Sequence, residues 1–449
     1  MVEGAVAGRV KLAVLIVLWL AAAIAILHQG WLAVEIWFRD PHIEQSARLF
    51  ARNDVDQAVF LKDIGAHSGP LGPLFWWHNG WHGTAYPNYW RPLTMLGFWT
   101  EYHLFGPYRF DRWQVADIFF HLIFAGVLGV FAYRVTGSRF AAPLTVLVLA
   151  NSYADLGSLS FSATYFTTPD GNVILGNWKD QPEAWGAAST VASLIAGLNR
   201  RWWWALGFAV VSICFKESGW LTFPMLLATF LYTGTLREIP RAAWIGTAIS
   251  WIVLVAMRAS AGRAVMSPVH DLNNHFPLVR YMRHVLDPNV QQLGTDRWAV
   301  VVFGAVTVCL LFWKRVPFLV RFLLIVVVGA VSAVMLGLAN RTDPASGLAM
   351  LVDPGIGLGQ MKMVVIETAA LLLAWRYRPV RRQALYLYSL VLLSDLPEMA
   401  VLQPNSHMLY FTNGLQCVLV VAIGMAAARS VVEAYKSRRL TRTTAVSTA

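Results

Sequence analysis

The residues best suited to chemistry are concentrated in one stretch of the chain, between Asp40 and Arg112. This stretch contains the run Tyr89-Trp90-Arg91-Pro92-Leu93 and several aspartates. It also holds five of the eleven histidines, which are His42, His67, His78, His82 and His103. Carboxylates and imidazoles can accept protons, and a guanidinium can hold an anion through two parallel hydrogen bonds. The pattern predicts that the functional site lies in this segment.

Three aspartates of this segment are candidates for a proton acceptor. Asp54 and Asp56 are two residues apart, so they share a face of a strand but diverge by about 200° on a helix. The apolar residues from Ile43 to Ile64 fit an amphipathic helix that lies on a membrane and carries its acids at the rim. Asp40 is the third candidate. An ordinary solvated acid pair would give the same pattern.

Two histidines near the middle of the segment allow two interpretations. His78 and His82 are four residues apart, so on a helix they could share a face and bind a metal ion. Gly80 and Gly83 favour a loop instead. We therefore predict no firm cofactor and no metal ligands, with a divalent cation left as an open alternative.

The composition identifies the class of protein. Hydrophobic residues make up 57% of the chain and charged residues 14%, and 20 residues are tryptophan. Such a chain cannot be packed into soluble domains of ordinary size, so we expect an all-α polytopic membrane protein. The net charge of +11 comes from short basic clusters between apolar runs, which argues against nucleic acid as a partner. Cys214, Cys309 and Cys417 lie in or beside apolar runs and are expected to be packing residues.

Apolar runs long enough for a bilayer predict about twelve membrane-spanning helices in one integral membrane domain, residues 1–449. The predicted spans are Leu12–His28 (with an extension to Phe38), Val115–Tyr133, Ala141–Tyr153, Ala184–Leu198, Trp203–Phe215, Leu221–Tyr232, Trp244–Met257, Trp298–Phe312, Phe318–Leu338, Met361–Trp375, Ala384–Leu396 and Phe411–Ala428.

The basic residues predict the orientation of these spans. Arg9 and Lys11 precede the first span, and the later basic clusters fall on the same side, which the positive-inside rule makes cytoplasmic. The C-terminal tail, about residues 430–449, belongs to this side. The long first loop, about residues 39–113, then lies outside the membrane. Few acids lie within the spans and no repeat is visible, which disfavours a transporter.

Three motifs, in order along the chain, resemble one protein family. The first comprises Tyr89-Trp90-Arg91-Pro92-Leu93-Thr94, Tyr102-His103-Leu104-Phe105-Gly106 and Asp117-Ile118-Phe119-Phe120-His121. The second is Phe215-Lys216-Glu217-Ser218, and the third is His407-Met408-Leu409-Tyr410. Together they resemble the GT-C glycosyltransferases, nearest to the transmembrane O-mannosyltransferase branch but without its tetratricopeptide repeats.

The resemblance implies a GT-C-type fold that moves a sugar, with inversion, from a polyprenyl- or dolichyl-phosphate carrier to a glycan, lipid or protein acceptor outside the membrane. Asp54, Asp56 or Asp40 would then remove the acceptor's proton. Arg91 would hold the donor phosphate as its negative charge develops. Further donor-phosphate candidates on the same side are Lys216, His407, Arg280 and Arg283. A structural alternative is that Arg91 caps the helix beginning at Pro92 or pairs with Glu101.

Other residues of the motifs have less specific predicted roles. His121 follows Asp117 by one helical turn, which favours a buried hydrogen bond between these two residues over a catalytic dyad. The aromatic residues of the loop would pack at the membrane interface or stack on sugar rings, and the candidates are Trp77, Trp81, Tyr89, Trp90 and His103.

Two other functions stay open at this point, a non-enzymatic lipid or solute transporter and a catalytically inactive GT-C relative. The short loops and the basic tail favour a bacterial plasma (inner) membrane over the endoplasmic reticulum. Membrane lipids are the remaining expected partners.

Overall fold

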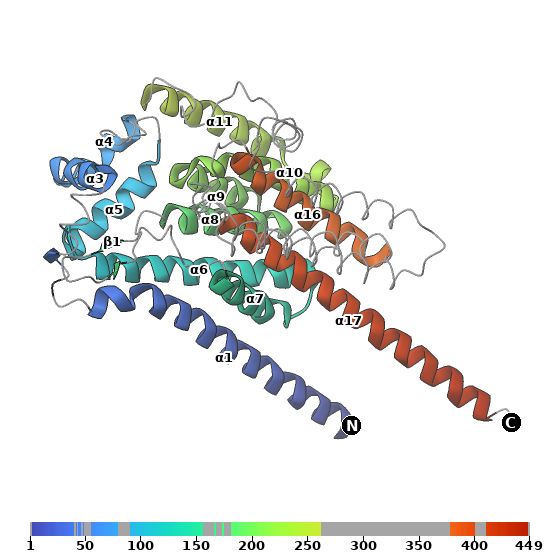
Figure 1. Ribbon diagram of the computed structural model, residues 1–449. Helices are drawn as coiled ribbons and strands as arrows, with labels where there is room; N and C mark the ends of the chain where they lie inside the picture. The colour runs from blue at the N-terminus through green and yellow to red at the C-terminus, as the bar shows by residue number, and fades with distance from the viewer. Residues whose placement is uncertain are drawn as a thin grey trace, which may run out of the picture.

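The computed structural model of the chain is a bundle of helices that run back and forth between two ends (Figure 1). The structure describes residues 2–39, 42, 44–45, 48, 55–79, 90–155, 166–167, 173–174, 181–261, 378–399 and 410–447. Three predicted spans, 298–312, 318–338 and 361–375, lie outside the described residues. The other nine each coincide with a described helix.

These nine helices are α1 (Val2–Arg39), α6 (Phe110–Thr136), α7 (Ala141–Asp155), α8 (Gln181–Leu198), α9 (Trp202–Phe215), α10 (Thr222–Thr233), α11 (Arg241–Ala261), α16 (Arg378–Met399) and α17 (Tyr410–Ser447). The long first loop adds α3 (Val55–Ala66), α4 (Gly72–His78) and α5 (Pro92–Phe105). The connections contain the 3-10 turns η2 (Glu217–Leu221) and η3 (Leu236–Glu238), and an antiparallel pairing of β1 (Phe166–Thr167) with β2 (Val173–Ile174). The described chain is therefore mostly helical, as predicted.

The first loop contains a helix where the sequence predicts an amphipathic one. The structure describes the second half of the predicted segment as a continuous helix. α3 covers the second half of Ile43–Ile64 and continues to Ala66. Leu61 and Ile64 are buried, so one side of α3 packs against other parts of the protein.

One hydrophobic core joins α1, α6, α7, α8, α9, α10, α16 and α17. α6 is central, because it packs against α1, α7, α8 and α17. Phe124 and Leu128 on α6, Leu194 on α8 and Val418 on α17 are completely buried in this core. Buried hydroxyls are paired within it, as where the hydroxyl of Thr190 lies 2.7 Å from that of Ser212 and 2.9 Å from that of Thr222. Such hydroxyl pairs stabilise helix contacts in an apolar environment.

The cysteines that the structure describes have the predicted packing role. Cys214 and Cys417 are buried, and neither forms a disulfide with a residue that the structure describes. Cys309 lies outside the described residues.

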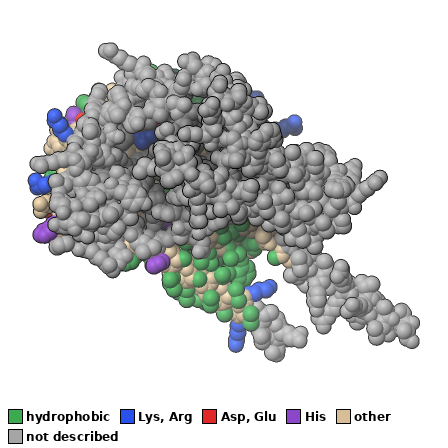
Figure 2. All heavy atoms as spheres, in the orientation of Figure 1, with side chains coloured by type: hydrophobic (Ala, Val, Ile, Leu, Met, Phe, Trp, Pro, Cys, Tyr) green, Lys and Arg blue, Asp and Glu red, His purple; other side chains and the backbone are tan. Residues whose placement is uncertain are grey.

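Three described helical segments are long and apolar enough to cross a membrane: Gly8–His28, Asp111–Thr136 and Arg241–Ala259. The side chains of α1 that face away from the bundle are apolar, including Ile16 at 51% and Ile24 at 68% exposure. Figure 2 shows this hydrophobic surface in the lower part of the view, with basic side chains at its end. Exposed apolar surface of this kind is stable in lipid and not in water, which indicates a membrane protein.

The two ends of the bundle differ in the segments that lie there. We call the end where α1 reaches Arg39 and α9 reaches Phe215 the loop end, because α3, α4 and α5 lie there (Figure 1). The terminal end has both chain termini, together with the turns that join α6 to α7, α8 to α9, and α10 to α11. The basic pairs of these turns lie at the terminal end, and they are Arg134 and Arg139, Arg200 and Arg201, and Arg237 and Arg241. This grouping agrees with the alternation of basic loops in the sequence.

The C-terminal helix extends well past its apolar part. α17 has 38 residues, whereas its apolar segment is Tyr410–Ala426. The basic tail of residues 430–449 therefore continues α17 as helix up to Ser447.

Candidate functional site

Arg91 is positioned by the proline that follows it. Pro92 is the first residue of α5, where the missing backbone N–H costs no hydrogen bond. A residue before proline is driven away from helical backbone, and Arg91 has φ −137° and ψ 64°. Because Pro92 is buried, the start of α5 fixes the point from which the Arg91 side chain extends.

Lys216 and Glu217 lie where α9 stops at the loop end. Lys216 is extended, with φ −155° and ψ 150°, and the chain then turns tightly through η2. Gly219 permits this turn, because a Cβ atom there would overlap the backbone of Ser212 on α9. The local sequence therefore places two successive, oppositely charged side chains at one corner of the bundle.

An ion pair joins the first two motifs, whose residues are 126 positions apart. Nη2 of Arg91 lies 2.7 Å from Oε2 of Glu217, and Nε of Arg91 donates a 2.8 Å hydrogen bond to the same oxygen. Beside this pair, the hydroxyl of Thr94 donates to the carbonyl oxygen of Phe215 at 2.6 Å. The start of α5 is thus held against the end of α9 by a charged and a neutral contact.

A second ion pair lies next to the first. Lys216 pairs with Glu183 in the first turn of α8, and both residues are buried. Arg258, in the last turn of α11, is close enough to act on Glu217 electrostatically. We call Arg91, Glu183, Lys216, Glu217 and Arg258 the ionic cluster. Three cations and two carboxylates give it a formal charge of 3 − 2 = +1.

Glu217 is at the centre of the ionic cluster. Burial raises the pKa of its carboxyl, but the charge and hydrogen bond of Arg91 and the charge of Arg258 outweigh burial and hold that pKa below its usual range. Oε1 of Glu217 and Nε of Arg258 are buried with no hydrogen-bond partner among the described residues. The ionic cluster therefore has hydrogen-bonding capacity for a further polar group.

Aromatic side chains pack around the ionic cluster. Trp90, which precedes Arg91, is 2% exposed and packs with Ile213 and Leu254. Its Nε1 donates to the carbonyl oxygen of Trp77 at 3.3 Å, and the two rings meet edge to face. The burial of Trp90 favours a packing role over stacking on a sugar.

Trp185 fills the space between α5, α6 and the end of α9. Its ring lies 4.6 Å from that of Phe120 and 5.2 Å from that of Phe215, measured between centroids. Gly97 on α5 faces this ring, and a Cβ atom there would overlap it. A glycine is therefore needed at this position for α5 to approach the bundle.

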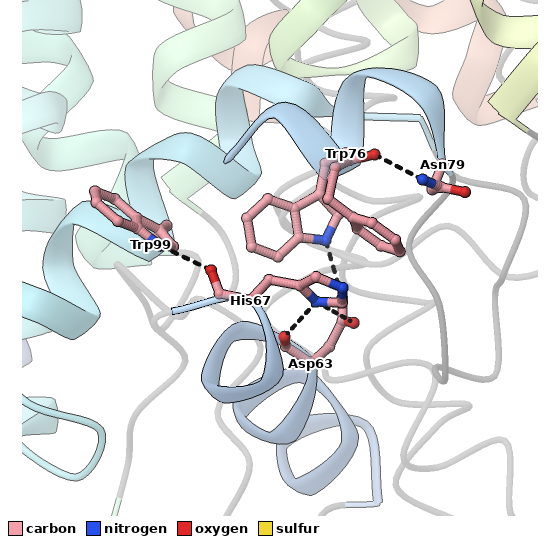
Figure 3. Close-up of polar contacts among 6 residues, drawn as sticks. Asp63, His67, Trp76, Asn79 and Trp99 are labelled. Carbon is pink, nitrogen blue, oxygen red and sulfur yellow. Dashed lines mark hydrogen bonds and ion pairs between the residues drawn. The ribbon is translucent and has the colours of Figure 1, made fainter. Parts of the chain in front are cut away.

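Figure 3 shows how α3, α4 and α5 are tied into one unit. Nε1 of Trp76 donates to Oδ2 of Asp63 at 2.9 Å, and Nδ1 of His67 lies 2.9 Å from the carbonyl oxygen of Asp63. Nε1 of Trp99 donates to the carbonyl oxygen of His67 at 3.1 Å. The imidazole of His67 is also stacked on Phe75, with centroids 3.8 Å apart. We call these residues, Asp63, His67, Phe75, Trp76 and Trp99, the loop clamp.

His103 on α5 contributes to the same arrangement. Its Nδ1 lies 2.7 Å from the carbonyl oxygen of Trp99, and its Nε2 lies 2.8 Å from that of Ser68. Because both ring nitrogens are engaged with backbone carbonyls, His103 joins α5 to the turn after α3.

The third motif also meets the first. Nδ1 of His121 on α6 lies 2.6 Å from the hydroxyl of Tyr410, the first residue of α17 and 289 positions away. Both residues are buried, and so is Asp117 one turn earlier on α6. The sequence predicted Asp117 as the hydrogen-bond partner of His121, whereas the structure gives Tyr410 as a partner, which the spacing did not indicate.

Several predicted site residues cannot be placed. Asp56 is in the first turn of α3, but its side chain is not described. The others lie outside the described residues, and they are Asp40, Asp54, Trp81, Tyr89, Arg280, Arg283 and His407. His78 ends α4, whereas His82 is also outside the described residues. Within the described part of the chain, no group of three or more His, Cys, Asp or Glu side chains could hold a metal ion.

Glu183 and Arg258 were missed as site residues. Each is next to a predicted span, since Glu183 precedes Ala184 and Arg258 follows Met257. The position of a charged residue at the loop-side end of a predicted span is therefore the sequence feature that could have identified both residues.

Comparison of the chain with known protein families, with curated proteins and with solved structures finds no match.

Proposed function

We propose that this chain is a membrane glycosyltransferase of GT-C type, with about twelve spans, that transfers a sugar from a polyprenyl-phosphate carrier to an acceptor on the extracytoplasmic side. One observation supports this most. The three motifs are far apart in sequence, yet the first contacts both of the others, through the Arg91–Glu217 pair and the His121–Tyr410 pair. Residues that serve one reaction have to converge in this way.

The ionic cluster is suited to hold the donor phosphate. Its formal charge is +1, and a buried cation stabilises the negative charge that develops on a leaving phosphate more strongly than one in water does. Arg91 offers the planar fork that matches phosphate, and Lys216 and Arg258 add point charge beside it. Glu217 and Glu183 would hold these cations in position until the donor arrives.

The loop helices are suited to bring the base to the donor. Asp56 lies on α3, which the loop clamp ties to α5 through the hydrogen bond between Trp99 and the carbonyl oxygen of His67. α5 in turn begins beside Arg91. A carboxylate from Asp54, Asp56 or Asp40 would take the proton of the acceptor hydroxyl.

The test is donor affinity in variants of Arg91. Arg91→Lys retains the charge but lacks the fork, so donor binding should weaken by about 1 to 3 kcal/mol, and Arg91→Ala should lose more. The measurement is titration of purified protein with polyprenyl-phosphate sugars, with the melting temperature recorded for each variant. Arg109→Ala is the matched control, because Arg109 is also in the first loop and pairs with a carboxylate, Asp111, at 2.7 Å. Equal donor affinity in the native chain and Arg91→Ala would exclude the phosphate role.

The loop aspartates are tested by turnover. If Asp54 or Asp56 is the base, its replacement by Asn should lower turnover about a hundredfold or more and leave donor binding nearly intact. Unchanged rates in both variants would transfer the role to Asp40.

The partly buried Arg91–Glu217 pair would also suit a protein in which Arg91 only cross-links α5 to α9. A transporter or a catalytically inactive relative would then be the better description. In that case Arg91→Ala lowers the melting temperature while donor affinity per folded molecule stays constant.

A further inference from the structure

A cavity opens between α9, α10 and α11, away from the ionic cluster. Its volume is about 280 Å³. All of its lining side chains are apolar except Thr247. Leu227 and Trp244 line the cavity and are nevertheless 44% and 46% exposed, so it opens on the surface between α10 and α11. In a membrane protein such an opening faces hydrocarbon.

The cavity begins at the terminal end of the bundle. Trp202 is the first residue of α9, Ala243 is in the first turn of α11, and Ile239 lies in the turn between α10 and α11. From this end the lining follows α10 from Phe230 back to Phe223, which corresponds to roughly 10 Å of helix. The cavity therefore has room for part of a hydrocarbon chain.

Three arginines lie within two positions of residues that line the start of the cavity. Arg201 precedes the lining residue Trp202, Arg237 precedes Ile239 by two positions, and Arg241 precedes Ala243 by two positions. All three are exposed.

The same two turns contain one more charged pair. Arg200 pairs with Glu238 at 2.8 Å. The described turns 199–201 and 234–241 thus hold four arginines and one carboxylate, a formal charge of 4 − 1 = +3. This end of the cavity attracts an anion at the depth where lipid headgroups lie.

We propose that the cavity binds an acyl chain of an anionic phospholipid whose phosphate lies against Arg201, Arg237 and Arg241. The apolar lining recognises the chain, and the excess positive charge recognises the headgroup. Neither half of this site belongs to the ionic cluster, so the proposal is independent of the glycosyltransferase function.

Two simpler arrangements make different predictions. If the arginines serve only to orient the helices in the membrane, their replacement would not change lipid binding in the cavity. A cavity that any lipid chain fills would bind zwitterionic and anionic phospholipids equally well. The experiment therefore varies the headgroup, the arginines and the cavity separately.

The full chain is purified in a neutral detergent and titrated with phosphatidylglycerol or phosphatidylcholine, while the melting temperature and lipid retention in native mass spectrometry are measured. Phosphatidylglycerol should raise the melting temperature and be retained, and phosphatidylcholine should do neither. The double variant Arg201→Gln, Arg241→Gln should bind phosphatidylglycerol about tenfold or more weakly. Arg139→Gln, at the α6–α7 turn of the same end, is the charge control and should bind normally.

The cavity is tested by filling it. Ala243→Leu places extra atoms in the cavity and should abolish the stabilisation by phosphatidylglycerol, whereas Ala242→Leu, at the exposed neighbouring position, should not. If Ala243→Leu unfolds, the double arginine variant alone tests the proposal. Both of its substituted positions are exposed, so this variant should remain folded. Equal effects of the two lipids, normal binding by the double variant, or tighter binding of a polyprenyl phosphate than of phosphatidylglycerol would each overturn the proposal. None of these results would alter the expected behaviour of the Arg91 variants.

Discussion

At the loop end the side chain of Arg91 is 14% exposed and pairs with Glu217 at 21%, whereas at the terminal end Arg200 is 60% exposed and pairs with Glu238 at 48%. The distances are nearly equal, 2.7 and 2.8 Å. The surroundings differ, because the first pair is enclosed by helices and the second is open to solvent. Since the strength of a charged contact depends on what surrounds it, the two pairs should differ in their contribution to stability far more than in geometry.

The largest expected difference follows from removing one carboxylate at each end. Glu217→Gln takes a charge from a largely buried pair and should lower the free energy of unfolding by about 3 kcal/mol. Glu238→Gln breaks an exposed pair and should lower it by about 0 to 1 kcal/mol. Denaturant unfolding in detergent measures both. Similar losses in the two variants would show that enclosure does not strengthen the Arg91 pair.

A smaller difference is expected between two threonines of α5. The hydroxyl of Thr94 is buried and bonds across to α9, whereas that of Thr100 is exposed and bonds to Leu96 within its own helix. Thr94→Val should lower stability by about 2 kcal/mol, since the carbonyl of Phe215 loses its buried donor, and Thr100→Val should change it little. Thermal unfolding of both variants tests whether the contact between α5 and α9 is specific. Equal effects would mean that only the loss of a hydroxyl matters.

The smallest effect is the dependence of the Glu217 contribution on pH. Because the folded-state pKa of Glu217 is lowered, its contribution to stability is complete above the ordinary glutamate pKa and is lost as the pH falls through the folded-state pKa. One carboxyl changes stability by at most about 1.4 kcal/mol per pH unit. Melting curves should be recorded between about pH 7 and pH 3. The difference in melting temperature between the native chain and Glu217→Gln should become smaller only at the acidic end of this range. A gap that widens on acidification would contradict the lowered pKa.

Local sequence patterns predicted the positions of the helices well. They predicted few of the contacts between residues far apart in sequence. The prediction Trp203–Phe215 differs from α9 by one residue, because an apolar run bounded by charged residues marks a span directly. The start of α5 at Pro92 was predicted for a similar local reason. Arg91 occupies the N-cap position of α5, as the structural alternative proposed, but its side chain makes no capping hydrogen bond.

The partner of Arg91 could not be predicted in the same way. Glu217 is 126 positions away, and its proximity depends on the packing of α5 against α9, which no local pattern encodes. Glu101 was the nearer acid in sequence, and nearness in sequence was the only guide. The same reason hid Tyr410 as a partner of His121. Motif order suggested that these residues act together, but only the packing of the helices shows which side chains meet.

The helical C-terminal tail has a mechanical consequence. From the end of the apolar segment at Ala426 to Ser447, α17 continues for 21 residues, which corresponds to about 30 Å at 1.5 Å per residue. A flexible tail of that length would sweep out a broad volume, whereas a continuous helix keeps its basic residues at set heights along a rod. α17 can thus hold positive charge at a fixed distance from its apolar segment. That distance is set by the number of residues between them.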